Sequence, residues 1–138
     1  MSLIVTITPN PCIDTNSSVP ELLPDKKLQC TYCKSEPGGG GINVSRVITR
    51  LGGKTIAVYI AGGYNGNFLT DTLQKDGIES IVIKIKENTR QNFIVMDEST
   101  GLQYRFGMPG PTIKETELQE CLQTIDALHD VFICCCQW

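Results

Sequence analysis

The chain has 138 residues, of which 41% are hydrophobic and 20% are charged, so length and composition fit one ordinary globular domain. Its net charge of −3 argues against a nucleic-acid-binding face, which would require a basic surface. No apolar run approaches the length of a membrane span, and the N-terminus lacks the basic start and apolar core of a signal peptide. We therefore expect a cytoplasmic protein with neither nucleic acid nor membrane as a partner.

The first third of the chain predicts a strand, a polar region and a helix. Residues 3–8 are apolar and β-branched and end at a Pro-Asn-Pro turn, which indicates a strand followed by a loop. Residues 12–36 alternate in polarity and predict short strands. The glycines at 38–41 and at 52–53 frame a helix. Its apolar stripe at helical spacing would be Val44, Val47, Ile48 and Leu51.

The middle of the chain alternates strands with helices. Residues 55–61 form a continuous apolar run of strand length, typical of a buried parallel strand. We expect a helix at 67–75 and an alternating strand at 81–85. Residues 91–96 and 103–106 then predict two strands joined by a hairpin-like turn.

The last predicted helix begins near Thr112, where Thr112 and Glu115 have the spacing of a capping box. Its buried stripe would be Leu118, Cys121, Leu122 and Ile125. An apolar strand at 131–136 follows.

This order of elements predicts an α/β fold with a mainly parallel sheet flanked by helices. The half-polar regions 12–36 and 90–106 would form a small, separate antiparallel lid. No linker divides the chain, so residues 1–138 are treated as part of one domain.

The seven cysteines are expected to be thiols, because an odd number cannot all pair within one chain. Cys30 and Cys33 form a C-x-x-C pair that could bind zinc or carry out redox chemistry. A structural zinc site needs about four ligands, and no second pair stands at a suitable spacing. The pattern therefore favours a strand in which Leu28, Cys30 and Tyr32 alternate with polar neighbours.

The glycines at 38–41 precede a predicted helix, which is the arrangement of a flexible turn or of an anion or polyol site. A Rossmann G-x-G-x-x-G would need glycine at Asn43 or Val44. A P-loop would need Gly-Lys-Ser/Thr where Ile42-Asn43 stands. Both dinucleotide and P-loop motifs are therefore excluded.

Residues 36–47 (Glu-Pro-Gly-Gly-Gly-Gly-Ile-Asn-Val-Ser-Arg-Val), with the Gly-Gly that follows Leu51, resemble the first signature of the ribokinase-type, or pfkB-type, carbohydrate kinases. Four further segments resemble the phosphosugar branch of that family: residues 6–14, 61–63, 89–92 and 103–110. With glycine at position 40, the sequence resembles the 6-phosphofructokinases of the bacterial minor-isozyme type. The fructose-1-phosphate and tagatose-6-phosphate kinases usually carry lysine at this position. The resemblance covers residues 1 to about 132 and implies a ribokinase-like fold.

The resemblance also implies roles for single residues. Asp14 would accept hydrogen bonds from sugar hydroxyls, and a turn residue is the alternative. Gly38 and Gly39 would offer backbone N–H groups, and Asn43 a side-chain amide, unless it only caps the helix. The substrate phosphate would be bound by Arg90, supported by Arg105, because a guanidinium binds phosphate through paired charged hydrogen bonds. Lys27 would be a lid lysine that reaches substrate or nucleotide, in some members across a dimer.

The resemblance implies transfer of phosphate from ATP, with magnesium, to fructose 6-phosphate. The family takes its catalytic base and its anion hole from a second signature, Asp-Thr-x-Gly-Ala-Gly-Asp, which these 138 residues do not contain, and the magnesium region is absent as well. No catalytic residue and no metal ligand is therefore assigned, and we expect an inactive N-terminal part of a kinase with a truncated core. Residues 133–138 (Ile-Cys-Cys-Cys-Gln-Trp) replace the expected Ser-Gly-Ser-Leu-Pro-like loop, which indicates a frameshift or a premature stop, or else a natural short product.

The expected partners are a small sugar phosphate and a second copy docked through the lid. An open sheet edge at the last strand would also favour oligomers or poor solubility. Three alternatives stay open: a non-catalytic remnant that binds sugar phosphate or subunits, a kinase for tagatose 6-phosphate or fructose 1-phosphate, and a thiol or metal protein built on Cys30 and Cys33.

Overall fold

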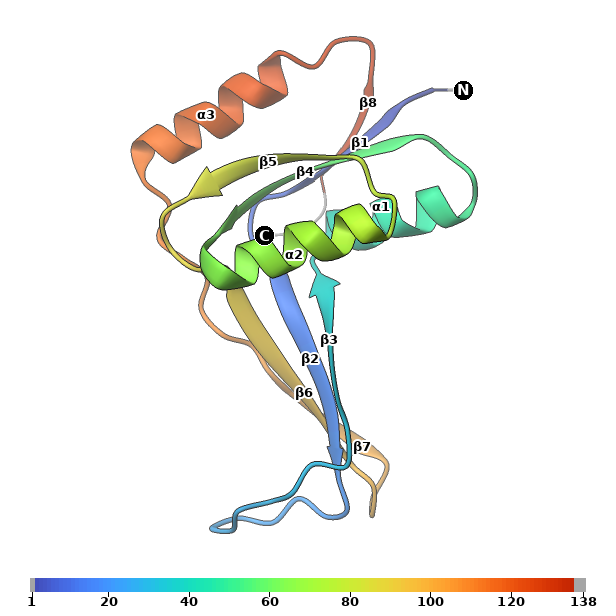
Figure 1. Ribbon diagram of the computed structural model, residues 1–138, viewed down its shortest axis with the longest axis vertical. Helices are drawn as coiled ribbons and strands as arrows, with labels where there is room; N and C mark the ends of the chain where they lie inside the picture. The colour runs from blue at the N-terminus through green and yellow to red at the C-terminus, as the bar shows by residue number, and fades with distance from the viewer. Residues whose placement is uncertain (1, 136–138) are drawn as a thin grey trace.

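The computed structural model describes residues 2–135 and places them in two four-stranded sheets and three helices (Figure 1). The elements in chain order are β1 Ile4–Thr8, β2 Cys12–Val19, β3 Cys33–Gly38, α1 Gly40–Arg50, β4 Thr55–Gly62, α2 Gly63–Lys75, β5 Ser80–Ile85, β6 Arg90–Asp97, β7 Leu102–Phe106, α3 Glu115–Asp126 and β8 Phe132–Cys135. The predicted α/β order is confirmed. The prediction for Cys136 lies outside the described residues.

Sheet A is the core of the fold, and its strands run parallel throughout in the order β5-β4-β1-β8. Helices α1 and α2 lie over one face and α3 over the other, so the core has three layers (Figure 1). Strand β4 is almost entirely buried, as its continuous apolar run predicts for a strand covered on both faces.

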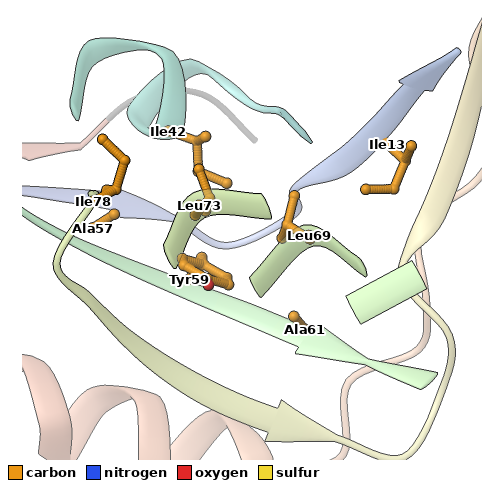
Figure 2. Packing of buried hydrophobic residues seen from close by; sticks show 8 residues of the cluster. All are labelled: Ile13, Ile42, Ala57, Tyr59, Ala61, Leu69, Leu73 and Ile78. Atoms are coloured by element: carbon orange, nitrogen blue, oxygen red, sulfur yellow. The ribbon is translucent and has the colours of Figure 1, made fainter. Parts of the chain in front are cut away.

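Alternate residues of β4 divide the core into two apolar clusters. Tyr59 and its neighbours two residues away face α1 and α2, where Ile42, Leu69 and Leu73 are fully buried against them (Figure 2). Val58 faces the other way, toward α3. Both faces of the sheet are therefore packed, which fixes the position of the strands that lead to the lid.

The buried face of α1 differs from the predicted one. Val47 is 52% exposed and Leu51 is 82% exposed, whereas Gly41, Ile42 and Ser45 are buried. The reason is steric: a Cβ on Gly41 would lie 2.5 Å from Thr8 Oγ1, so only the glycine side of the helix can approach β1 this closely. The rotation of α1 is therefore set by the close approach of its glycine side to sheet A, and the predicted apolar stripe does not determine it.

Buried hydroxyl groups fix the same helix against the sheet. Thr6 Oγ1 and Ser45 Oγ lie 2.7 Å apart, and Ser45 Oγ lies 2.9 Å from Thr55 Oγ1. Thr8 Oγ1 accepts a hydrogen bond from the backbone N–H of Ile42 at 3.1 Å, inside the first turn of α1. Helix α1 is thereby attached to β1 and β4 by polar as well as apolar contacts.

The start of α2 lies four residues before the predicted one. Gly63 has a positive φ of 65°, which allows the chain to turn directly from β4 into the helix. The side-chain oxygen of Asn88 then accepts a hydrogen bond from the N–H of Asn65 at 3.0 Å. A cap supplied from another part of the chain is invisible in the local sequence.

Helix α3 begins three residues later than predicted, and the expected capping box at Thr112 is wrong. The N–H of Thr112 donates instead to Glu87 at 2.7 Å, and Glu117 accepts from the N–H of Lys114 at 2.8 Å. Within the predicted stripe Cys121 is buried and Ile125 packs against the core, but Leu118 and Leu122 are exposed. Since α3 packs mainly on β5, only a narrow side of it is covered.

Sheet B is the predicted lid and extends away from the core in the order β3-β2-β6-β7 (Figure 1). Its outer pairs are antiparallel as expected, but the central pair β2–β6 is parallel, so the sheet is mixed. The predicted strand through Leu28, Cys30 and Tyr32 is wrong, because β3 begins only at Cys33. Residues 20–32 instead form an irregular loop at the far end of the lid (Figure 1).

None of the helices within residues 2–135 is long and apolar enough to cross a membrane.

Candidate functional site

The strand register of the lid gathers polar side chains on one face. Cys12 pairs with Arg90, Asp14 with Asn92, and Ile94 with Arg105. Paired residues in adjacent strands point to the same side of a sheet, and every second residue shares that side. Residues scattered between positions 12 and 105 therefore meet over one patch of sheet B.

A pocket of about 300 Å³ lies where this face of the lid meets the N-terminus of α1. Its lining combines backbone glycines, a carboxylate, two guanidinium groups and side-chain amides. The residues are Asn10, Cys12, Asp14, Gly39, Gly40, Asn43, Arg90, Asn92, Phe93, Ile94, Arg105, Phe106 and Gly107.

At Gly38 and Gly39 the backbone itself lies close to the pocket, because neither residue has a side chain. Gly39, the N-cap of α1, has a φ of 124°, a conformation that residues with side chains rarely adopt, and within the first turn the N–H of Ile42 donates to Thr8 Oγ1. A Cβ on Gly38 would lie 2.6 Å from Cys12 Sγ and would also collide with Asp14 Oδ2. A helix start of this kind presents N–H groups and a partial positive charge to a ligand.

Asp14 is held from one side only. Its Oδ1 accepts hydrogen bonds from Asn92 Nδ2 at 3.2 Å and from the thiol of Cys12 at 3.3 Å. The same thiol lies in the pocket wall. Burial, together with the neighbouring Asp14 carboxylate, raises the pKa of Cys12 to about 12, so the thiol keeps its proton at neutral pH.

Arg90 is fixed by backbone carbonyls rather than by a carboxylate. Its guanidinium donates to the carbonyl of Asn10 at 3.2 Å and to that of Met108 at 3.4 Å. The Nε atom is buried and has no hydrogen-bond partner within residues 2–135. A guanidinium with unused donors beside a pocket suits an anionic ligand.

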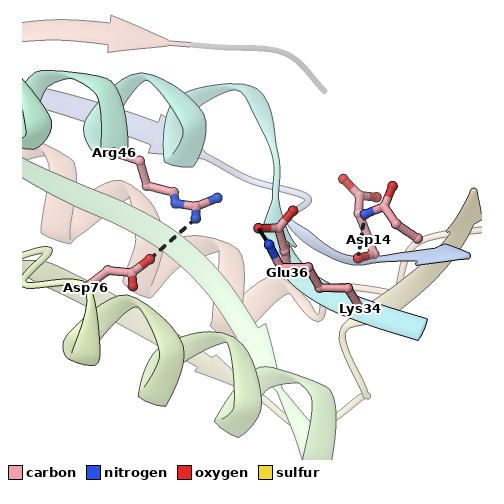
Figure 3. Close-up of polar contacts among 6 residues, drawn as sticks. Asp14, Lys34, Glu36, Arg46 and Asp76 are labelled. Carbon is pink, nitrogen blue, oxygen red and sulfur yellow. Dashed lines mark hydrogen bonds and ion pairs between the residues drawn. The ribbon is translucent and has the colours of Figure 1, made fainter. Parts of the chain in front are cut away.

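Two ion pairs are formed by residues that do not line the pocket. Lys34 and Glu36 pair on β3 at 3.1 Å, and Arg46 of α1 contacts Asp76 at the end of α2 at 3.4 Å (Figure 3). Asp14 lies opposite Glu36 across the β2–β3 pair. The charged side chains that line the pocket are those of Asp14, Arg90 and Arg105.

Of the residues predicted from the sequence, Asp14, Gly39, Asn43, Arg90 and Arg105 line this pocket together. Gly38 lies behind them, against Asp14 and Cys12. Lys27 is different: it belongs to the loop at the far end of the lid and does not line the pocket.

The sequence prediction missed Asn10, Cys12 and Asn92. Cys12 stands two residues before Asp14 and Asn92 two residues after Arg90, so both share a strand face with a predicted site residue. That alternation is a signal that could have identified them. Asn10 sits in the loop after β1, where no periodicity applies.

No group of three or more histidine, cysteine, aspartate or glutamate side chains in the part of the chain that the structure describes is arranged to hold a metal ion. Cys30 and Cys33 are exposed free thiols. The donor set of the pocket suits a polyol with an anionic group.

Residues 3–131 match the family described as pfkB family carbohydrate kinase. The chain belongs to this family of sugar kinases.

Two relatives that the chain matches are phosphofructokinases. The chain is 42% identical over 120 residues to the ATP-dependent 6-phosphofructokinase isozyme 2 of Escherichia coli, an alignment that covers 87% of this chain and 39% of that protein. It is 40% identical over 122 residues to the isozyme 2 of Mycobacterium tuberculosis, covering 88% of this chain and 36% of the relative. The chain thus spans less than half the length of the relatives that it matches.

A solved structure has the same arrangement of elements. The crystal structure of phosphofructokinase-2 from E. coli in complex with fructose-6-phosphate superposes with a TM-score of 0.91 at 37% identity, covering 99% of this chain and 45% of that one. The ribokinase-like α/β fold with its lid is therefore confirmed.

Proposed function

We propose that this chain forms the sugar-phosphate side of an ATP-dependent 6-phosphofructokinase, and that fructose 6-phosphate binds in the pocket between the lid and α1. One observation carries the proposal: a carboxylate and a guanidinium face a single pocket at a glycine-rich helix start. A sugar phosphate has hydroxyl donors at one end and an anion at the other, which matches these two groups. The similarity to E. coli phosphofructokinase-2, solved with fructose-6-phosphate, supports the same assignment.

In this proposal each pocket residue has a separate task. Asp14 accepts hydrogen bonds from sugar hydroxyls, and Asn43 adds an amide at the helix start. The backbone N–H groups at Gly38 and Gly39 approach the sugar closely because neither residue has a side chain. Arg90 binds the phosphate, with Arg105 supporting it from the neighbouring strand.

The pocket binds and orients the acceptor, and phosphoryl transfer needs more than that. A base for the accepting hydroxyl, a nucleotide and a metal complete such a reaction. ATP and magnesium are expected from the family, but the described residues contain no cluster of ligands that fits the metal. We therefore assign to this chain the binding and orientation of the sugar phosphate and derive no transfer step from it.

The preference for fructose 6-phosphate over other phosphosugars rests on Gly40. This residue lines the pocket, so a lysine in its place would extend a charged side chain into the space available to the sugar. Fructose 1-phosphate and tagatose 6-phosphate are the competing acceptors.

Calorimetric titration of fructose 6-phosphate into the 138-residue chain and its Arg90→Ala variant tests the proposal. We expect the variant to bind about 10- to 100-fold more weakly, because hydrogen bonds to charged groups contribute about 1.5–3 kcal/mol. Arg50→Ala, which removes an exposed arginine of α1 outside the pocket, is the matched control and should bind as the unchanged chain does.

The same samples separate a kinase from a binding remnant. With ATP and magnesium added, we expect binding without turnover. Measurable formation of fructose 1,6-bisphosphate by the purified chain would show that it carries its own catalytic groups. Absence of fructose 6-phosphate binding would refute the proposed function, and tighter binding of fructose 1-phosphate or tagatose 6-phosphate would reassign the substrate.

We also propose that two copies dock through their lids. Strands β6 and β7 expose large apolar side chains, among them Phe93, Leu102, Tyr104 and Phe106. Exposed apolar patches of this kind mark interaction sites. In such a dimer Lys27, which does not line the pocket of its own chain, would reach the pocket of the second copy. Sedimentation of a monomer at high micromolar concentration would contradict the dimer.

A further inference from the structure

The two oxygens of Asp14 have different surroundings. Oδ1 receives two donors, Asn92 Nδ2 at 3.2 Å and the Cys12 thiol at 3.3 Å. Oδ2 accepts no hydrogen bond from residues 2–135 and lies against Gly38, which has no side chain to cover it. One oxygen of this carboxylate is fully engaged by the protein, and the other is left for a ligand.

Asn92 can donate to Asp14 in one orientation only. Its side-chain oxygen accepts a hydrogen bond from the backbone N–H of Met108 at 2.9 Å, which points the amide nitrogen toward Asp14. Met108 is also the residue whose carbonyl accepts from Arg90. The amide is therefore fixed by the backbone that borders the pocket.

Cys12 can donate because its thiol keeps its proton. The charged groups near it are Asp14, which favours the protonated thiol, and Arg90, which opposes it; burial is the larger effect. A thiol that stays neutral is a weak donor, but a carboxylate strengthens any hydrogen bond that it accepts.

We propose, on the basis of the proposed function, that Cys12 is a positioning residue for sugar recognition. Its thiol and the amide of Asn92 hold Asp14 Oδ1 so that Oδ2 faces the sugar hydroxyls. Cys12 does not touch the phosphate and acts on the sugar only through Asp14. Its effect on binding should therefore disappear when Asp14 can no longer act.

A double-mutant cycle measures this coupling. Fructose 6-phosphate is titrated at pH 7 into the unchanged chain, Cys12→Ala, Asp14→Asn and the double variant, with Cys12→Ser as the variant that keeps a donor. We expect Cys12→Ala to weaken binding about 3- to 10-fold, the range of one typical hydrogen bond with a weak thiol donor, and Cys12→Ser to stay within about 2-fold. In the Asp14→Asn background Cys12→Ala should change affinity by less than about 2-fold.

Titration of inorganic phosphate distinguishes positioning from a general structural effect. Because phosphate has no sugar hydroxyls, its affinity should be the same for the unchanged chain and for Cys12→Ala. Equal weakening of phosphate and of fructose 6-phosphate binding, or additive effects in the cycle, would overturn the inference. So would unaltered fructose 6-phosphate binding by Cys12→Ala. Failure of the unchanged chain to bind fructose 6-phosphate would instead remove the proposed function itself.

Discussion

The two sheets of this molecule differ in the burial and the polarity of their side chains. Strand β4 of sheet A is buried on both faces, and its side chains are apolar with little alternation. Strand β7 of sheet B is exposed along its whole length, and β2 is buried except at Asp14 and Asn16, which are half-buried. Sheet A holds the fold together, whereas sheet B directs polar side chains into the candidate pocket.

The pocket lies where these two regions meet. Strand β2 follows β1 after a short loop and carries Asp14 out of the core into the lid. Helix α1, packed on sheet A, supplies the glycine backbone on the opposite wall. In many proteins a well-packed core positions the binding groups, while a more exposed region beside it leaves room for the ligand to enter.

The largest expected effect comes from the core. Leu73 is fully buried among α1, α2 and β4, and Leu73→Ala should lower the free energy of unfolding by about 2–5 kcal/mol through lost burial and a residual cavity. Gln103→Ala in the lid, where the glutamine is exposed, should change it by less than about 0.5 kcal/mol. Urea unfolding of both variants measures the difference. Equal effects would mean that the lid contributes to stability as much as the core.

The next largest effect concerns binding and lies at the junction. A methyl group on Gly38 would collide with Asp14 Oδ2 and Cys12 Sγ, so Gly38→Ala should displace the carboxylate and weaken fructose 6-phosphate binding by about 10-fold or more. Calorimetric titration provides the measurement.

Gly107→Ala is the matched control for that variant, because Gly107 also lines the pocket but a methyl group there meets no atom within 4 Å. It should bind nearly as the unchanged chain does. If both variants lost affinity equally, general crowding of the pocket would explain the result better than displacement of Asp14.

The core was more predictable from the sequence than the contacts around it. The buried run of β4 and the glycine-framed helix α1 follow from local patterns, and both are present. The side of α1 that packs does not, because Gly41 allows an approach that exposes Val47 and Leu51. The parallel pairing of β2 with β6 is a contact between distant segments, which no local pattern encodes.

Only part of the pocket was predicted, because local patterns do not encode contacts between distant segments. Asp14, Asn43, Arg90 and Arg105 followed from resemblance to a sugar-kinase family, and they do share one pocket. Asn92 was missed, since its hydrogen bond to Asp14 exists only once β2 and β6 are paired. Cys12 was missed although it contacts Asp14 within β2, where only the alternation of the strand indicates it. Lys27 was placed by resemblance alone; its loop lies at the far end of the lid (Figure 1), and Lys27 does not line the pocket.

The smallest expected effect concerns the far end of the lid, where Asp97 holds the loop of residues 20–32. Its carboxylate accepts hydrogen bonds from the hydroxyl of Ser99 at 2.6 Å, from the N–H of Ser99 at 2.9 Å and from the N–H of Leu22 at 3.3 Å. These bonds, that of the Ser99 hydroxyl first, hold the pKa of Asp97 below its usual range.

The sign of the pH dependence follows from that depressed pKa. In the unfolded chain Asp97 would titrate near the ordinary aspartate value of about 3.9, so its stabilising contribution is complete above that pH and is lost as the pH falls through the lower value of the folded protein. Asp97→Asn should therefore lower stability at pH 7, and this difference should shrink as the pH falls below about 3.9. Glu21→Gln, in the exposed part of the same loop, is the control and should leave stability unchanged across this pH range.

Urea unfolding between pH 2 and pH 7 measures the stability of both variants, and limited proteolysis of residues 20–32 reports on the loop itself. A difference between Asp97→Asn and the unchanged chain that persists undiminished at the lowest pH would mean that Asp97 stabilises the lid through packing rather than through its charge.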